Sequence, residues 1–244
     1  MKGFLGVFLR ELLIIRKRIV KMLVSFSVSP LLYLIAFGWG IGQKITVEGM
    51  NYLSFLIPGL VAMSSMNRSF AISSEINIAR FYWKIFEEFQ AAPVSNLAIA
   101  AGEVLGGILR GLIASAVIVV LALFFGVHLN LGILFFLAVL GNTFAFSSLA
   151  LITSMLVKSH ADQAMLTNFV ITPMAFLCGT FFSLKTLPAW AYYTVKMLPL
   201  SHATIAIRAA ALGKPMPWNA LGITFCFGIV FFIAGVWAIR GAQE

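Results

Sequence analysis

The feature that most constrains this chain is a series of apolar runs, each about as long as a bilayer is thick. A membrane-spanning helix needs about 20 mostly apolar residues. Six segments of the chain qualify: 22–41, 53–73, 97–125, 131–157, 165–182 and 218–239. Only 10% of the 244 residues are charged, against about 25% in a typical soluble domain. We therefore predict an all-α integral membrane protein with six transmembrane helices, forming one transmembrane domain over residues 1–244.

The lysines and arginines predict how these six segments are oriented. With the N-terminus in the cytoplasm, ten of the 17 basic residues lie on that side: Lys2, Arg10, Arg16, Lys17, Arg18, Lys21, Arg80, Lys84, Lys158 and Arg240. Five lie outside: Lys44, Lys185, Lys196, Arg208 and Lys214. Because cytoplasmic loops carry an excess of Lys and Arg, both termini are expected in the cytoplasm. Membrane topology thus accounts for the net charge of +9, and nucleic acid is not expected as a partner.

The segment before the first span, residues 2–21, has the pattern of an amphipathic basic helix. Arg10, Lys17 and Lys21 share one helical face. The apolar residues lie mostly on another face: Phe4, Phe8, Leu12 and Ile15. Such a helix suits the cytoplasmic surface of a membrane. The basic residues also fit a role as simple topology anchors, and the sequence leaves both interpretations open.

A second amphipathic segment follows the second span. Residues 79–92 are typical of a short helix that Pro93 ends, and Ser95 or Asn96 can cap the next helix. An apolar stripe at helical spacing is formed by Tyr82, Phe86 and Phe89. The opposite face is polar, with Arg80, Lys84, Glu87 and Glu88. We interpret the segment as a docking element; the alternative is a helix that rests on the lipid surface.

Three charged residues fall inside predicted spans: Arg68, Glu103 and Arg110. A charge within the membrane is costly and is usually paired or faces water. Counted from the cytoplasmic ends, Arg68 and Glu103 fall at similar depth on consecutive antiparallel helices. We predict that they pair, either to fasten the two helices or to line a translocation route. Arg110 shares the face of Glu103. The third span also holds two overlapping small-xxx-small pairs, which permit close helix packing: Gly102, Gly106, Gly107 and Gly111.

The long outer loop, residues 183–217, combines apolar residues with four prolines. The stretch from Ser201 to Leu212 is expected to form a capped helix that ends at Gly213. No run in the loop reaches span length. We therefore predict two short re-entrant helices that dip into the outer leaflet before the last span. The alternative is a loop whose aromatic residues only anchor the interface.

The sequence contains no recognisable catalytic centre. It has no phosphate-binding loop of the G-x-x-x-x-G-K-[ST] type, and its three histidines lack metal-ligand spacing: His128, His160 and His202. Cys178 and Cys226 lie in apolar runs and do not indicate a disulfide. Catalytic residues, metal ligands and bound cofactors are therefore not expected on this chain. Active transport would need energy from a partner or from an ion gradient.

Several motifs resemble those of the membrane subunit of type-two ABC exporters. This family includes drug-efflux permeases, nodulation-factor exporters and exporters of O-antigen or teichoic acid. The motifs are FLIPGL at 55–60, EEF at 87–89, APVS at 92–95, GTFFSL at 179–184, and the Leu-Pro pairs at 187–188 and 198–199 followed by Arg208. Each is short, but their order and spacing extend over nearly the whole chain.

The resemblance implies a half-transporter that acts as a dimer, expected to be a homodimer, with two ATP-binding cassette subunits on its cytoplasmic side. ATP and magnesium would bind to those partners, so this chain is expected not to be an enzyme. Segment 79–92 would be a coupling helix that enters a cleft of the ATPase, with docking residues Tyr82, Phe86, Glu87, Glu88 and Phe89. The resemblance also implies a bacterial or archaeal inner membrane and export of a lipid-like, glycolipid or drug-like substrate.

Two other functions remain open at this point. A secondary transporter driven by an ion gradient would use the Arg68/Glu103 pair as a proton relay, although no inverted repeat is visible. A membrane protein without transport function, such as a scaffold or an enzyme acting on lipids, is the other, and the missing catalytic centre argues against the enzyme.

Overall fold

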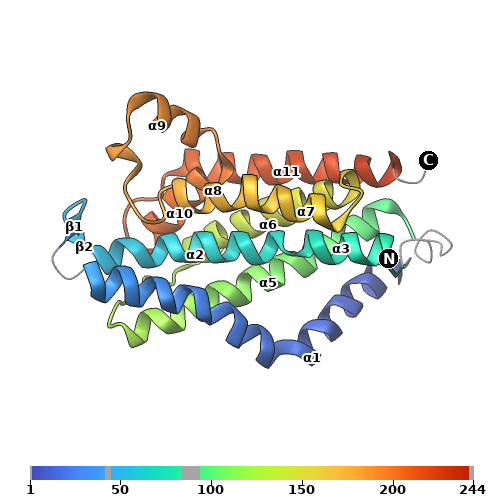
Figure 1. The fold of residues 1–244 in the computed structure, drawn as a ribbon, viewed down its shortest axis with the longest axis horizontal. Coiled ribbons are helices and arrows are strands. Elements are labelled where there is room, and N and C mark those ends of the chain that lie inside the picture. The colour runs from blue at the N-terminus through green and yellow to red at the C-terminus, as the bar shows by residue number, and fades with distance from the viewer. Residues whose placement is uncertain (1, 42–44, 84–93, 242–244) are drawn as a thin grey trace.

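The computed structural model describes residues 2–41, 45–83 and 94–241, which form a bundle of helices with one short β-hairpin (Figure 1). Its first half comprises α1 (Lys2–Tyr33), the π-helical η1 (Leu34–Ile41), β1 (Thr46–Val47), β2 (Met50–Asn51), α2 (Tyr52–Phe70), α3 (Ile72–Phe81) and α5 (Asn96–Phe124). Its second half comprises α6 (Ile133–Leu156), α7 (His160–Leu166), η3 (Thr167–Ile171), α8 (Thr172–Leu177), η4 (Leu184–Thr186), α9 (Ala189–Lys196), α10 (Pro199–Ala211) and α11 (Trp218–Gly241).

Four helices of the described chain are long and apolar enough to cross a membrane: Leu5–Gly38, Asn96–Phe124, Ile133–Leu156 and Trp218–Gly241. A predominantly helical protein with helices of membrane-spanning length is thereby confirmed. The other two predicted spans are helical too, but in shorter pieces. Helices α2 and α3 divide at Ala71, and the row α7, η3 and α8 covers the fifth predicted span. Six crossings therefore stay a prediction.

The two ends of the bundle differ in character. The N-terminal end of α1 and the C-terminal end of α11 lie at one end of the bundle, together with the C-terminal end of α3 and the N-terminal end of α5 (Figure 1). We call this the terminal end. The β-hairpin and α9 lie at the opposite end, which we call the hairpin end. The hairpin turns through Glu48 and Gly49, whose φ angles are +51° and +76°, as a two-residue hairpin turn requires.

Helix α2 is the central helix of the core. Nearly all of its side chains are buried, and it packs against α5, α6 and α10. Its polar residues find partners within the protein: the Asn142 side chain of α6 donates to the Ala62 carbonyl at 2.9 Å and to Ser65 Oγ at 2.8 Å. A helix that faces protein rather than lipid tolerates such residues, which explains why α2 is less apolar than its neighbours.

The predicted small-xxx-small pairs of α5 are confirmed as sites of close helix packing. Gly102 and Gly106 face α1, where a Cβ at Gly106 would lie 2.9 Å from the Cγ of Glu11. Gly107 and Gly111 face α2 and α6 at comparably short range. The two overlapping pairs thus serve different neighbours, and α5 is held between them.

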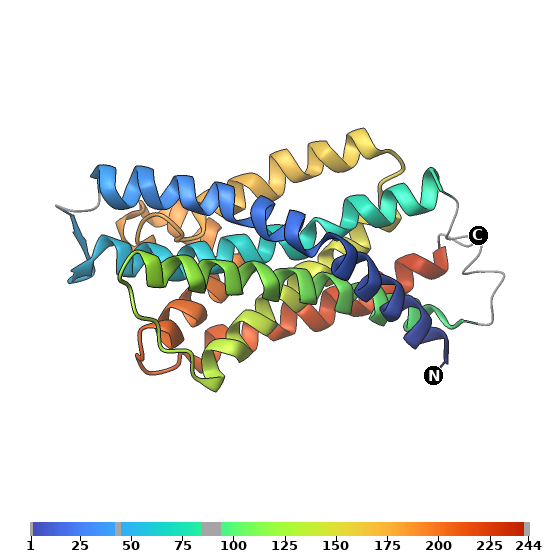
Figure 2. The same ribbon diagram turned by 90° about the horizontal axis from the view of Figure 1, so that it is seen from below.

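Helix α1 differs from the expectation in two ways. The predicted interfacial segment and the first span form one continuous helix, without a break near residue 21. The helix bends, so that its N-terminal part crosses α5 at an angle (Figure 2). The row that packs on α5 is Val7, Glu11 and Ile15, all buried, whereas Leu12 is exposed. The face of α1 that packs on α5 thus includes a carboxylate, which the glycines of α5 accommodate. That the other side of this segment lies on the membrane surface stays a prediction.

The outer loop contains the two predicted short helices, α9 and α10. Helix α10 begins at Pro199 rather than at a cap on Ser201, whose hydroxyl donates to the Val195 carbonyl at 2.6 Å. It ends as expected before Gly213, which has a φ of +64°. That these helices dip into the outer leaflet stays a prediction.

Candidate functional site

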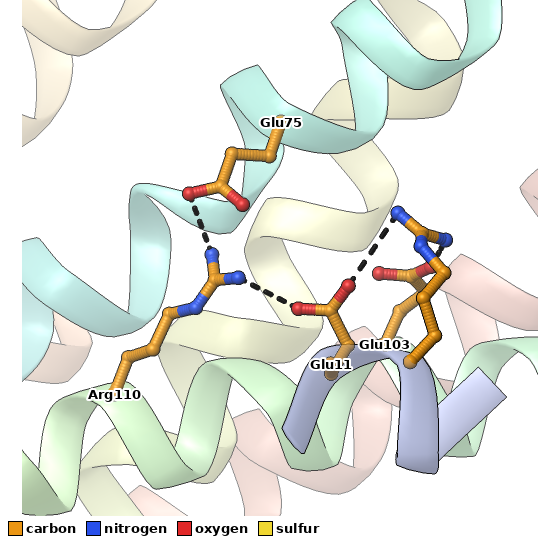
Figure 3. A network of polar contacts seen from close by, with 5 residues as sticks. Glu11, Glu75, Glu103 and Arg110 are labelled. Atoms are coloured by element: carbon orange, nitrogen blue, oxygen red, sulfur yellow. Dashed lines mark hydrogen bonds and ion pairs between the residues drawn. The ribbon is translucent and has the colours of Figure 1, made fainter. Parts of the chain in front are cut away.

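Five charged side chains from three helices form one network near the terminal end (Figure 3): Arg10 and Glu11 of α1, Glu75 of α3, and Glu103 and Arg110 of α5. The Nη2 of Arg110 donates to Glu11 Oε2 at 2.6 Å, and its Nη1 lies 2.7 Å from Glu75 Oε1. The Nη1 of Arg10 donates to Glu103 Oε1 at 3.3 Å, and its Nη2 lies 3.5 Å from Glu11 Oε1. The network therefore connects α1, α3 and α5.

Burial makes this network sensitive to the loss of its three buried members. The side chains of Glu11, Glu103 and Arg110 are only 2–4% exposed. A buried charge that loses its partner costs several kcal/mol. Three carboxylates face two guanidinium groups, and Arg110 lies between Glu11 and Glu75. Arg110 is thus the residue on which the connection between α1 and α3 depends.

Helix α3 is also fastened on its other side. The Asn77 side chain donates to the Val157 carbonyl at 2.9 Å, and Arg80 Nη1 donates to the Met155 carbonyl at 2.6 Å. Both acceptors lie at the end of α6, where carbonyl groups lack helical partners. From α7, Gln163 Nε2 donates to Ser73 Oγ at 3.1 Å. Polar bonds thus tie α3 to α5, α6 and α7, and through Arg110 to α1.

Of the predicted docking residues, Phe86, Glu87, Glu88 and Phe89 lie outside the described residues. Tyr82 follows α3 directly and is 85% exposed. The predicted start of a new helix at residue 79 is wrong, because residues 79–81 form the end of α3, which begins at Ile72. Ser95 caps α5, accepting from the amide of Ala98 at 3.3 Å, which confirms one of the two predicted caps.

Arg68 and Glu103 do not form the predicted pair. The Nη2 of Arg68 donates to the Ser25 carbonyl at 3.0 Å, and its guanidinium lies 4.3 Å from the centre of the Phe26 ring. Both partners belong to α1, while Glu103 binds Arg10. A proton relay through an Arg68/Glu103 pair therefore has no basis in this arrangement.

The register of α5 against α2 explains the error. Gly111 lies against Ser65 and Ser69 of α2. Glu103 precedes Gly111 by about two helical turns, which places it at the level of α3 rather than of Arg68. Counting inward from predicted span ends missed this offset, because α3 extends α2 by a further ten residues.

This correction gives a direct prediction. We expect the double charge reversal Arg68→Glu/Glu103→Arg to destabilise the protein by the sum of the two single effects, within about 0.5 kcal/mol, because residues without a shared contact act additively. The unfolding temperatures of the purified single and double variants in detergent measure this. The matched pair Arg10→Glu/Glu103→Arg should be more stable than the sum of its singles. Rescue in the first pair, and not in the second, would contradict the observed pairing.

A second cluster, which we call the outer clasp, consists of Phe55, Gly59, Gly179, Thr180 and Arg208. From α10, Arg208 Nη2 donates to the Gly179 carbonyl at 2.6 Å and Nε donates to the Phe55 carbonyl at 3.3 Å. Its Cζ lies 3.8 Å from the centre of the Phe55 ring, a cation–π contact. A Cβ at Gly59 would lie 2.5 Å from the Thr180 carbonyl oxygen. Three separate sequence motifs, 55–60, 179–184 and Arg208, therefore meet in one place.

Sequence reasoning missed Glu11 and Glu75. Both are among only eight acidic residues in the chain, and Glu11 stands in a strongly basic segment. The rarity of acidic residues in this chain was thus the signal that could have drawn attention to Glu11 and Glu75. It marks the two residues but does not reveal their common partner, because residues 11, 75 and 110 come together only in the folded bundle.

The family of this chain is identified by its similarity to known proteins. The sequence profile of the family described as ABC-2 type transporter matches residues 4–212. The chain therefore belongs to the ABC-2 type transporter family, whose members are membrane transport subunits and not enzymes in themselves.

Individual relatives cover most of the chain. It is 31% identical over 220 residues to the inner membrane transport permease YadH of Escherichia coli K12, with 88% of this chain and 84% of that protein covered. It is 30% identical over 243 residues to nodulation protein J of Rhizobium meliloti strain 1021, with 98% and 93% covered. Nodulation protein J of Rhizobium leguminosarum bv. viciae is 28% identical over 246 residues.

Proposed function

We propose that this chain is the membrane subunit of an ATP-driven exporter, powered by separate ATP-binding cassette subunits that bind ATP and magnesium and dock at the terminal end. One observation supports the proposal: α3 leads directly into the predicted coupling segment, has polar contacts to α5, α6 and α7, and is connected to α1 through Arg110. The contacts of Glu75, Asn77 and Arg80 span only 2.6–2.9 Å. A movement of the segment between α3 and α5 would therefore be transmitted to α1, α6 and α7 through these short contacts.

Docking would use side chains of the predicted coupling segment. Tyr82 contributes an aromatic ring, and its exposure supports this role. Phe86 and Phe89 would enter an apolar cleft, and the carboxylates of Glu87 and Glu88 would face basic residues of the ATPase. Hydrophobic anchors surrounded by complementary charges are typical of protein interfaces.

The proposed topology has six crossings with both termini in the cytoplasm. The shared location of the described ends of α1 and α11 supports an even number of crossings (Figure 1). The basic residues Arg10, Arg16 and Lys17 lie in the N-terminal half of α1, which begins at the terminal end, in agreement with the positive-inside rule. A location in the inner membrane is proposed because the Escherichia coli relative is an inner membrane transport permease.

The complete exporter would contain two permeases and two ATPases. Helices α1 and α11 expose long apolar surfaces to lipid or to a second copy. A homodimer and a lipid-like, glycolipid or drug-like cargo, taken from the cytoplasm or inner leaflet, are part of the proposal.

The test is co-purification from the native membrane in mild detergent, followed by mass spectrometry. We expect a soluble subunit with a phosphate-binding loop to accompany the wild-type chain and to be lost from Glu87→Arg/Glu88→Arg, because charge reversal opposes a basic partner surface. Glu244→Arg, an acidic-to-basic change at the C-terminus, should retain the subunit. Absence of any such subunit from an intact wild-type sample would refute the ATP-driven reading and favour a gradient-driven transporter.

A further inference from the structure

A cavity of about 270 Å³ adjoins the outer clasp at the hairpin end. It is lined by residues of the hairpin, of the loop around η4, of α9 and of α10. Its charged lining residues are Glu48, Lys185, Lys196, Arg208 and Lys214. Among the described residues, four cations and one carboxylate therefore line the cavity, an excess of three positive charges.

The single carboxylate does not neutralise this surface. Glu48 Oε1 accepts from Ser183 Oγ at 2.6 Å and lies 3.9 Å from Lys185 Nζ. The hydrogen bond from Ser183 lowers the pKa of Glu48, with Lys185, Arg208 and Lys214 acting in the same direction against partial burial. Glu48 is thus ionised at neutral pH and already hydrogen-bonded to Ser183. Its single negative charge does not balance the positive charges of the lining cations.

The cations differ in how firmly they are held. Arg208 is fixed by the outer clasp, and burial lowers its pKa to about 10, so it stays charged at neutral pH. Lys196 Nζ lies 5.4 Å from the centre of the Tyr192 ring. Lys185, Lys196 and Lys214 are exposed, so their ammonium groups can approach a ligand at little cost.

A buried hydroxyl provides an independent indication of a ligand. Thr204 lines the cavity, is 1% exposed, and its Oγ1 has no hydrogen-bond partner among the described residues. Buried hydroxyl groups nearly always have a partner. An oxygen-rich anion in the cavity would supply an acceptor for this hydroxyl and counter-charges for the lysines.

We propose that the cavity binds a phosphate group, with Lys185, Lys196 and Lys214 pairing its oxygens and Thr204 donating one hydrogen bond. Phosphate offers several acceptor oxygens in different directions, which matches cations that converge from separate elements. The phosphate belongs either to a lipid headgroup or to a soluble ion. That the cavity faces the outside rests on the proposed topology; the binding itself does not.

The test uses the purified full-length chain in phosphate-free buffer and non-ionic detergent. Inorganic phosphate and dihexanoyl-phosphatidylglycerol are titrated separately, and binding is followed by the unfolding temperature from tryptophan fluorescence. We expect saturable stabilisation that weakens as ionic strength rises. The ATPase is absent from this binding assay. A failure to bind phosphate would therefore leave the exporter proposal intact. Conversely, loss of the ATPase in the co-purification experiment would leave the phosphate-site proposal intact.

Two variants with a matched control make the result specific. Lys185→Gln/Lys196→Gln/Lys214→Gln should weaken binding at least about tenfold, which corresponds to about 1.4 kcal/mol. Lys17→Gln/Lys21→Gln/Lys158→Gln removes the same charge from exposed lysines elsewhere and should leave binding unchanged. Thr204→Val should weaken binding several-fold while the unliganded protein unfolds at the same or a higher temperature, a combination that a purely structural role does not produce.

The relative affinities of the two probes identify the source of the phosphate group. Tighter binding of the short-chain lipid than of inorganic phosphate assigns the cavity to a headgroup, and the reverse order assigns it to a soluble anion; both support the site. The proposal is overturned if neither probe stabilises the wild-type chain, or if the two triple lysine variants bind equally.

Discussion

Replacing Arg110 with alanine is expected to destabilise the protein by about 3–5 kcal/mol, because the change leaves the buried carboxylate of Glu11 with its longer, 3.5 Å contact to Arg10 and removes the partner of Glu75. The loss should also break the connection between α1 and α3. In the proposed exporter we therefore expect the ATP-driven activity to fall further than the loss of stability alone predicts. The unfolding temperature of the purified chain measures the first effect. The ATPase rate of the reconstituted complex measures the second.

The controls separate charge pairing from size. Arg16→Ala removes an exposed arginine from α1 and should change stability by less than about 0.5 kcal/mol. Glu11→Gln/Arg110→Gln removes both charges together and should recover much of the loss, because replacing both members of a buried pair is far cheaper than removing one. An Arg110→Ala variant as stable as Arg16→Ala would contradict the buried network.

Substituting Gly59 with alanine is the second change for which we expect a large effect. The new Cβ would lie 2.5 Å from the Thr180 carbonyl oxygen and 3.0 Å from Arg208 Nη2. The carbonyl belongs to the backbone and cannot rotate away, so the clasp must open. We expect a loss of about 1–3 kcal/mol, measured as a lower unfolding temperature of the purified chain.

A matched glycine gives the opposite sign. A Cβ at Gly222 of α11 would meet nothing within 4 Å, and alanine is favoured over glycine in a helix by up to about 1 kcal/mol. Gly222→Ala should therefore leave the protein as stable as wild type or more stable. Equal responses of the two alanine variants would show that Gly59 is not in close contact with Thr180.

The outer clasp brings three motifs that lie far apart in the chain into one place. FLIPGL supplies the Phe55 carbonyl and the close approach at Gly59, GTFFSL supplies the Gly179 and Thr180 carbonyls, and Arg208 joins them. Each motif is short because each contributes one or two contacts. Their separation along the chain reflects where α2, the loop after α8, and α10 meet.

Local patterns were enough to predict the helices α5, α6 and α11 within a few residues, the two short helices of the outer loop, and the glycine contacts of α5. These features depend on composition and spacing over one or two turns, or on the length of one apolar run. Where the prediction depended on how two elements align, it failed: the Arg68/Glu103 pair required a register between α2 and α5 that no local pattern specifies.

By itself, the sequence determined that this protein is a helical membrane protein, which residues are scarce and charged, and where the chain must turn. Apolar length and charge placement suffice for this, because the cost of exposing polar backbone to lipid leaves few alternatives. The tertiary structure alone decided which charges meet. Arg110 faces Glu11 and Glu75, and Arg208 faces two carbonyl groups, because helix packing sets the offset between chain segments that lie far apart in sequence.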